Sequence, residues 1–243
     1  MKSISIAALL IATSAVARPE SAAAQSAAPG LDGYLTLGTG YWNRGLSQND
    51  DGLSVQLGVD YQHRSGFFVG GELADVDYAA EDPSNEPREL EMDTYLGFHR
   101  RNTEWSWTLT LVHYLYPDST ARFDYSEVSA SVGFRDRIFF STSYTDDFFS
   151  LRRSALNSEL AMALPLAWNL ELSAALGRFD VDVTSTSEYT HWNLGLSKVA
   201  RRVVLDLRYY DNSYELVTPL GDPASNRFVL SVSYAFRGTR IRI

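Results

Sequence analysis

Acidic side chains stand at alternating positions along several stretches of this sequence, and that spacing could do chemistry in two ways. Inside a water-filled lumen, carboxylates on one face would favour the passage of cations. Alternatively, a site that raises the pKa of one carboxylate could use it for acid–base catalysis. A third interpretation is structural: the acids would meet arginine, tyrosines and water in a packed interior. The candidate lumen-lining residues are Asp60, Glu72, Glu91, Asp93, Glu127, Glu159, Glu171, Asp206 and Arg208.

Other residue types that carry chemistry are poorly placed for catalysis or metal binding. The chain has no cysteine, and its four histidines are far apart, so we expect neither a metal site nor a cofactor. Residues 189–195 resemble the Y-T-H-x-S-N-G motif of outer-membrane phospholipase A, in which His is the base and Ser is the nucleophile. Here Asn193 stands at the serine position, and an amide cannot replace an activated hydroxyl. We therefore predict that the protein is not an enzyme, and a lipid hydrolase is only a third hypothesis.

β-Strands must position these residues, because apolar and polar side chains alternate with a period of two from residue 34 onward. Residues 53–62 show it clearly, with Leu53, Val55, Leu57, Val59 and Tyr61 in one phase. The segment at 158–164 is the weakest, because it is short and rich in alanine. The twelve segments of this kind are 34–43, 53–62, 67–77, 89–99, 104–115, 124–134, 137–147, 158–164, 168–178, 189–198, 202–211 and 226–236.

The connections between these segments alternate between short and long, which is typical of outer-membrane β-barrels. A strand of about ten residues rises ~34 Å, and a ~45° tilt leaves ~24 Å of height, close to the apolar band of such a barrel. A soluble sandwich or barrel would also alternate, with the apolar phase facing a dry core. We prefer the membrane barrel because aromatic residues cluster near segment ends, as at Tyr41 and Trp42, Trp105 and Trp107, Tyr114 and Tyr116, and Tyr209 and Tyr210.

The side chains in the phase that we assign to the lumen are unusually small. Glycine lets a strand curve and lets a large neighbouring side chain lie over the backbone, and a narrow barrel needs both. Gly71 is the main exception, in the outward phase. The inward glycines are Gly38, Gly58, Gly70, Gly97, Gly133, Gly177 and Gly195.

Export through the periplasm is indicated by the N-terminus. Residues 1–24 have the positive start, short apolar run and small residues of a signal peptide, with cleavage after Ala17 or, preferably, Ala24. Residues 25–33 would be a short periplasmic segment, 34–236 the barrel and 237–243 a tail beyond Phe236. The formal net charge of −9 argues against a nucleic-acid partner. The expected partners are outer-membrane lipid, lipopolysaccharide and the barrel assembly machinery of a Gram-negative bacterium.

One element has a recognisable pattern. Residues 41–48, Tyr-Trp-Asn-Arg-Gly-Leu-Ser-Gln, resemble the Y-x-x-R-G-x-S-Q element of the Gcw_chp family of bacterial proteins, with Tyr41, Arg44, Gly45, Ser47 and Gln48 as the matching positions. Weaker matches follow in order over residues 34–236, including an E-x-x-x-Y-x-G strand from residue 91 to 97 and a Y-x-Y-P element from 114 to 117. The resemblance implies an outer-membrane barrel, and it carries no established reaction.

Two interpretations of the Arg44 element remain open. In one, Gly45 makes a turn and Arg44 packs into a loop network. In the other, the planar guanidinium of Arg44 is aimed at lumen acids or at lipopolysaccharide phosphate. For the whole protein, the leading hypothesis is a small passive pore for ions or small polar solutes. The alternative is a plugged barrel that acts structurally or as a surface-binding platform.

Overall fold

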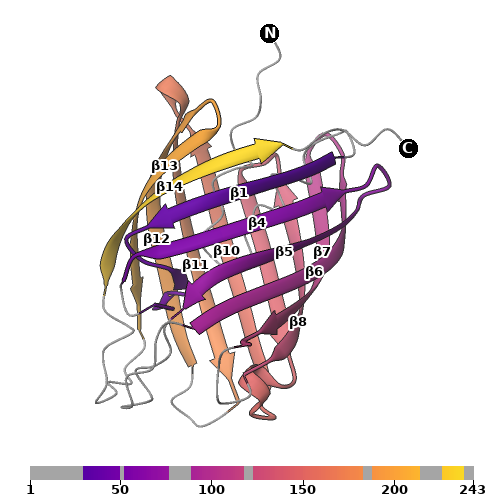
Figure 1. Cartoon of the computed structure of the whole chain (residues 1–243). Helices are drawn as coiled ribbons and strands as arrows, with labels where there is room; N and C mark the ends of the chain where they lie inside the picture. Colours follow the sequence, from indigo (N-terminus) through magenta and orange to yellow (C-terminus); the bar gives the residue numbers. More distant parts are fainter. Residues whose placement is uncertain are drawn as a thin grey trace.

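Twelve strands close into one antiparallel β-barrel in the computed structural model, which describes residues 30–49, 52–76, 89–117, 123–182, 188–213 and 226–237 (Figure 1). The predicted signal peptide lies outside these residues. Among the described residues, no helix is long and apolar enough to cross a membrane. The barrel strands are β1 (Gly30–Gly38), β4 (Ser54–Gln62), β5 (Phe67–Val76), β6 (Glu89–Arg101), β7 (Trp105–Leu115), β8 (Tyr125–Phe134), β9 (Ile138–Thr145), β10 (Ala155–Pro165), β11 (Leu170–Val181), β12 (Glu188–Ala200), β13 (Val203–Asn212) and β14 (Arg227–Arg237).

Closure joins the first strand to the last, as β1 pairs with β14 through contacts such as Tyr34 with Ala235. Each strand therefore has a hydrogen-bonded neighbour on both sides, which is what a sheet needs in lipid, where no water can satisfy an open edge. The predicted twelve-stranded barrel is confirmed. Two further short strands, β2 (Trp42–Asn43) and β3 (Leu46–Ser47), pair only with each other and lie outside the barrel sheet.

Most strand boundaries differ by a few residues from the predicted ones, and two strands are informative. The first strand covers residues 30–38, so it begins earlier than the predicted 34–43 and ends before Tyr41. The weakest predicted segment, 158–164, is a full strand of eleven residues, because pairing with β9 and β11 extends it from Ala155 to Pro165. Propensity underestimated β10 because its alanines add little to a local β signal, whereas its two neighbours complete its ladder.

The short connections lie at one end of the barrel, beside the start of β1 and the end of β14 (Figure 1). They include residues 63–66, 102–104, 135–137 and 201–202. Positive φ angles close several of them tightly, for example 53° at both Arg135 and Asp136. The longer connections run at the opposite end. Of these, 77–88, 118–122, 183–187 and 214–225 contain residues that lie outside the described part of the chain. We refer to the short-turn end as the inner end and to the opposite end as the outer end.

The outer surface of the barrel is apolar. An exposed apolar surface that encircles a protein indicates a lipid environment rather than water. Each barrel strand contributes at least one large side chain that is 39–56% exposed: Leu35, Leu57, Val69, Leu96, Leu109, Val128, Phe140, Leu160, Leu176, Leu194, Leu207 and Leu230.

Aromatic rings border this apolar surface, but not all the rings that the sequence indicated. Trp105 and Trp107 are exposed at the inner end of β7, as expected for a membrane-interface belt. In contrast, Tyr41, Trp42, Tyr114, Tyr116 and Tyr210 are buried inside the barrel. Clustering near segment ends therefore does not by itself place a ring in the belt, because alternation puts these five in the inward phase or in a loop that folds inward.

Leu57 and Gln56 provide a test of the two faces. Leu57 is exposed on the lipid face, whereas Gln56 faces the lumen. We expect Leu57→Arg to prevent stable insertion, because a cation near the bilayer midplane of a barrel costs roughly 2–4 kcal/mol. Gln56→Arg should insert normally. The measurement is heat-modifiable gel mobility of outer-membrane fractions, and equal behaviour of the two variants would contradict the assigned faces of β4.

Candidate functional site

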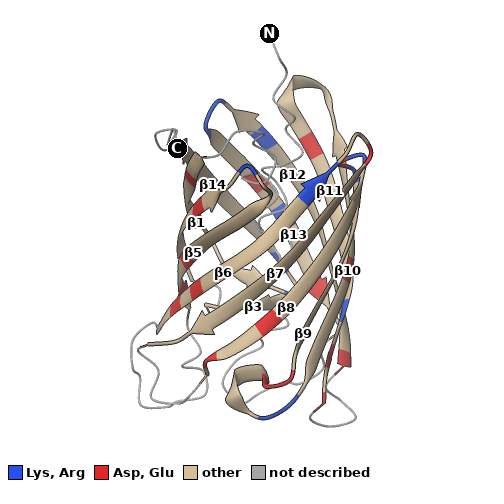
Figure 2. Ribbon diagram, turned by 90° about the vertical axis from the view of Figure 1, so that its right-hand side faces the viewer, with Lys and Arg blue, Asp and Glu red and all other residues tan. Residues whose placement is uncertain are grey.

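The first connection at the outer end folds back into the barrel lumen. After β1 ends at Gly38, residues 41–48 form the β2–β3 hairpin, closed by a hydrogen bond from the Gln48 amide to the Tyr41 carbonyl (2.8 Å). Figure 2 places β3 inside the wall formed by β7 and β8. The hairpin spans the lumen, and we call residues 41–48 the lumen hairpin.

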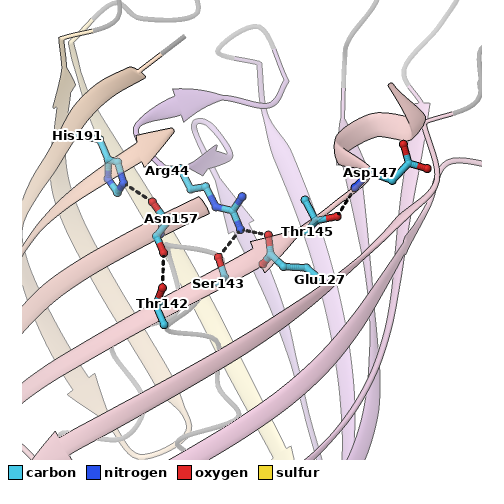
Figure 3. A network of polar contacts seen from close by, with 8 residues as sticks. All are labelled: Arg44, Glu127, Thr142, Ser143, Thr145, Asp147, Asn157 and His191. Carbon is cyan, nitrogen blue, oxygen red and sulfur yellow. Dashed lines mark hydrogen bonds and ion pairs between the residues drawn. The ribbon is translucent and has the colours of Figure 1, made fainter. Parts of the chain in front are cut away.

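Arg44 at the tip of the lumen hairpin forms a buried ion pair on the far wall (Figure 3). One of its terminal nitrogens donates to Glu127 on β8 (2.5 Å) and to Ser143 on β9 (3.1 Å). Its guanidinium carbon lies 5.0 Å from the centre of the Phe179 ring on β11. Of the two interpretations of Arg44, the structure thus agrees with the one in which its guanidinium is aimed at a lumen acid.

Arg44 is charged in this position. Burial is the largest single effect and by itself lowers the pKa of the guanidinium, but Glu127, Tyr114 and Tyr125 together outweigh it and hold the pKa above its ordinary value. Both partners are almost fully buried, and the pair joins the lumen hairpin to the wall at β8. A buried pair of this kind is costly to break from one side, since the remaining charge has no compensation.

Gly45 lets the hairpin turn against the opposite wall. Its φ is +79°, and a Cβ at this position would lie 2.5 Å from the Cβ of His191 on β12. Its carbonyl accepts a hydrogen bond from the side-chain amide of Asn212 (2.7 Å). Glycine is required both by the left-handed backbone and by the close approach to β12. Gly45 does make the turn, as the structural interpretation predicted.

The other residues of the recognised element also hold the hairpin. The Tyr41 hydroxyl donates to Glu91 on β6 (3.1 Å), and Ser47 pairs with Trp42 across the two short strands. The Gln48 side-chain amide donates to the carbonyl of Leu46 (3.1 Å). Trp42 stacks on Tyr210 of β13 at 5.3 Å. The residues of this element therefore form a single hairpin, and contacts with several strands of the wall hold it in place.

All eight predicted lumen acids are buried and face inward. Register pairs place Glu72 on β5 opposite Asp93 on β6. Tyrosine hydroxyls are prominent partners: Tyr34 donates to Glu72, Tyr95 donates to Asp60, and Tyr116 donates to Glu91 (2.7 Å). The acids do not gather in one cluster; they are distributed along the strands (Figure 2).

Glycines organise these contacts by letting side chains cross a strand. Tyr34 on β1 pairs with Gly58 on β4, and Gly58 pairs with Glu72 on β5, so the tyrosine passes over the glycine to reach the acid. Tyr95 passes over Gly70 in the same way to reach Asp60. The prediction that inward glycines accommodate large neighbours is confirmed at these positions.

Arg208 forms the second buried ion pair, and it too crosses a glycine, Gly195. It contacts Asp206 on its own strand (3.1 Å), Asn193 on β12 (2.6 Å) and Ser173 on β11 (2.9 Å). The fully buried Glu171 lies near this group, and neither of its carboxylate oxygens has a hydrogen-bond partner within the described structure.

Two arginines that the alternation would place in the inward phase are not inside the barrel. Arg202 and Arg227 are exposed at strand ends, where solvent reaches them. His99 does face inward and is buried, with its Nδ1 3.0 Å from the Thr108 hydroxyl. The second arginine of the lumen is instead Arg44, which comes from a connection rather than a strand.

The phospholipase-like segment lies inside the barrel as well. His191 and Asn193 both point inward from β12, as their spacing requires. His191 Nε2 lies 3.0 Å from the Asn157 side-chain oxygen (Figure 3). Its Nδ1 lies 3.9 Å from Glu159. No nucleophilic hydroxyl stands at position 193. In the described part of the chain, no group of three His, Asp or Glu residues could hold a metal ion.

A family model described as "Bacterial protein of unknown function (Gcw_chp)" matches residues 22–239. The chain belongs to the Gcw_chp family. No curated protein sequence matches it. Among solved structures, the NanC porin is similar with a TM-score of 0.57 and 9% identity, over 85% of this chain and 98% of that one. The KdgM porin in complex with disordered oligogalacturonate has a TM-score of 0.51 and 11% identity, over 85% and 99%. At such identities the likeness shows the fold alone, a porin-like transmembrane barrel.

Several residues of this Gcw_chp lumen had no functional signal in the sequence. Ser143 and Phe179 contact Arg44, and Tyr34 donates to Glu72, but none of these three residues stands in a recognised motif. Tyr95, which donates to Asp60, is the tyrosine of the E-x-x-x-Y-x-G strand. The inward glycines were the available clue, because a glycine in register between a tyrosine and an acid marks a crossing. Using that clue requires the strand register, which periodicity alone does not provide.

Proposed function

We propose that this Gcw_chp protein is a narrow channel of the Gram-negative outer membrane that passes cations and small polar solutes. It would reach that membrane through the periplasm, by way of its signal peptide and the barrel assembly machinery. Its apolar belt would contact lipid, and its outer end would face lipopolysaccharide. The proposal concerns passive passage and requires no cofactor.

The excess of buried acids over buried arginines carries this proposal. Among the described residues, eight carboxylates are buried and only two arginines are, Arg44 and Arg208. Eight carboxylates against two guanidinium groups give the interior an excess of negative charge, which attracts cations and repels anions. This excess of charge favours the passage of cations.

The inner half of the lumen has the character of a vestibule. Its inward residues are small and partly exposed, such as Ser106, Thr108, Ser129 and Ser131. A cavity of about 40 Å³ lies along the wall of β1, β4, β13 and β14, between Thr36 and Trp42 of the lumen hairpin. The outer half is filled by the lumen hairpin and by aromatic rings. We infer that the hairpin sets the narrowest point.

The solved relatives in fold support a channel, though not a particular solute. NanC and KdgM are porins, and the KdgM structure holds an oligogalacturonate, a polyanion. The lumen of this chain carries predominantly acids, which would repel a polyanion. We therefore propose a different solute class for this protein, one that is positively charged or neutral.

Ion selectivity in planar bilayers tests the proposal. A negative lumen concentrates cations, so the potassium-to-chloride permeability ratio of purified protein should be on the order of 10 in dilute salt. The ratio should fall towards unity in concentrated salt, since the Debye length shrinks from ~30 Å at 0.01 M to ~3 Å at 1 M. An anion preference, or no current at any salt concentration, would contradict the proposed function.

A further inference from the structure

The contacts of Arg44 do more than hold the lumen hairpin in place. We propose that Glu127, Ser143 and Phe179 form a binding site for an organic cation with a guanidinium or primary amino group, and that Arg44 occupies this site as a built-in ligand. The inference deepens the proposed channel function, on which it rests, by naming the class of solute that the lumen recognises.

The three wall residues supply what a guanidinium requires. The Glu127 carboxylate accepts a charge-assisted hydrogen bond at 2.5 Å, and the Ser143 hydroxyl accepts a second one at 3.1 Å. The Phe179 ring, 5.0 Å from the guanidinium carbon, offers its negative face to the cation. These residues come from β8, β9 and β11, so the barrel wall holds the site whether or not the hairpin is present.

The present occupant does not use the site fully. The Nε of Arg44 is buried and has no hydrogen-bond partner among the described residues. Its backbone has a φ of 50°, in the left-handed region that a non-glycine residue adopts at a cost. A free guanidinium compound would carry neither constraint, and it could orient all its donors. We therefore expect that a solute of this class can replace the Arg44 side chain at the site.

The charges around the site would bring such a solute to it. Glu91 lies on the same side of the hairpin, bonded to Tyr41 and Tyr116, and Glu159 lies near His191 on the opposite wall. Together with Glu127 these acids make the surroundings negative, which attracts cations and repels anions. The neutral analogue of guanidinium, urea, would gain nothing from this field and little from Glu127.

Chemical rescue of Arg44→Ala provides the experiment, with ethylguanidinium as the probe. We expect millimolar ethylguanidinium to raise the midpoint of thermal unfolding of Arg44→Ala, read from heat-modifiable gel mobility, by about 5–10 °C near saturation. The wild-type protein, whose site is occupied, should shift much less. Urea and sodium chloride, at the same concentration and the same ionic strength respectively, control for shape and for screening.

The double variant Arg44→Ala/Glu127→Gln is the matched control, because it lacks the carboxylate that should carry the binding. Rescue of the single variant but not of the double variant supports the site. Equal shifts in both variants, or shifts no larger than those in sodium chloride, overturn it. If Arg44→Ala does not fold, Arg44→Met, which keeps the aliphatic length, takes its place under the same criteria.

Failure of the site and failure of the channel remain distinguishable. Thermal rescue is measured without any current, so a barrel that binds ethylguanidinium but conducts nothing would retain the site and lose the channel. A barrel that conducts cations without rescue would retain the channel and lose the site. In a conducting Arg44→Ala barrel, ethylguanidinium should also block the potassium current, with a weaker block when Glu127 is replaced.

Discussion

The Arg44→Glu variant will carry a several-fold larger ionic current than the wild-type protein. The substitution removes the buried ion pair with Glu127 and sets two carboxylates against each other at the far wall. Leaving a buried charge without its partner costs about 3–5 kcal/mol. The lumen hairpin can relieve that cost by leaving the lumen, because β2 and β3 pair only with each other.

The barrel itself should survive this change, since no strand of the closed sheet is altered. Single-channel conductance measures the opening, and heat-modifiable gel mobility shows that the barrel is folded. The control is the charge swap Arg44→Glu/Glu127→Arg, which should return the conductance towards the wild-type value. Unchanged conductance in a folded Arg44→Glu barrel would show that the lumen hairpin does not limit the current.

Strand phase could be predicted from the sequence because it depends on local alternation. Leu57 faces lipid and Gln56 faces the lumen, and the eight acids are inward, as the period of two requires. The closure of the barrel could also be predicted, because an even number of strands with alternating connections leaves few topologies. These properties need no knowledge of which side chains touch across the lumen.

The lumen hairpin could not be predicted, because alternation does not reveal where a strand leaves the sheet. The inward phase continues through Gly38 and Gly40 to Trp42, and the sequence predicted one strand over 34–43. In the structure the chain leaves the sheet after Gly38, and aromatic burial against Tyr210 holds the loop inside. The point at which the chain leaves the sheet is therefore decided by contacts with β13, a strand that is distant in the sequence.

The partners of the acids were predicted by type but not one by one, for a related reason. The structural interpretation had the acids meet arginine and tyrosines, and tyrosines do reach Glu72 and Glu91. Arg208, however, bonds to Asp206 and to its neighbours on β11 and β12, not to the acids of β5 and β6. Each such contact crosses a strand, so it depends on register and on the glycine beneath it, two properties of the assembled sheet.

Neutralising three acids together, as Glu72→Gln, Glu91→Gln and Asp93→Asn, should remove much of the cation preference and leave the barrel folded. These residues lie on neighbouring strands, with Glu72 in register with Asp93, so their charges add at one level of the lumen. Tyr34 and Tyr116 can still donate to amide oxygens at positions 72 and 91. The substitution therefore removes charge while keeping acceptors for those two hydroxyls.

The permeability ratio in dilute salt is the decisive measurement, because screening is weakest there. The triple variant should approach the unselective ratio that the wild-type protein shows in concentrated salt. The matched control is Asp75→Asn, which removes one acid from the outward phase of β5 and should leave the ratio unchanged. A triple variant that loses its heat-modifiable mobility, in a protein whose wild type carries no current, would mean that these acids hold a closed barrel together. A folded triple variant with full cation preference would place the selectivity elsewhere in the lumen, with Glu127 and Glu159 as the next acids to replace.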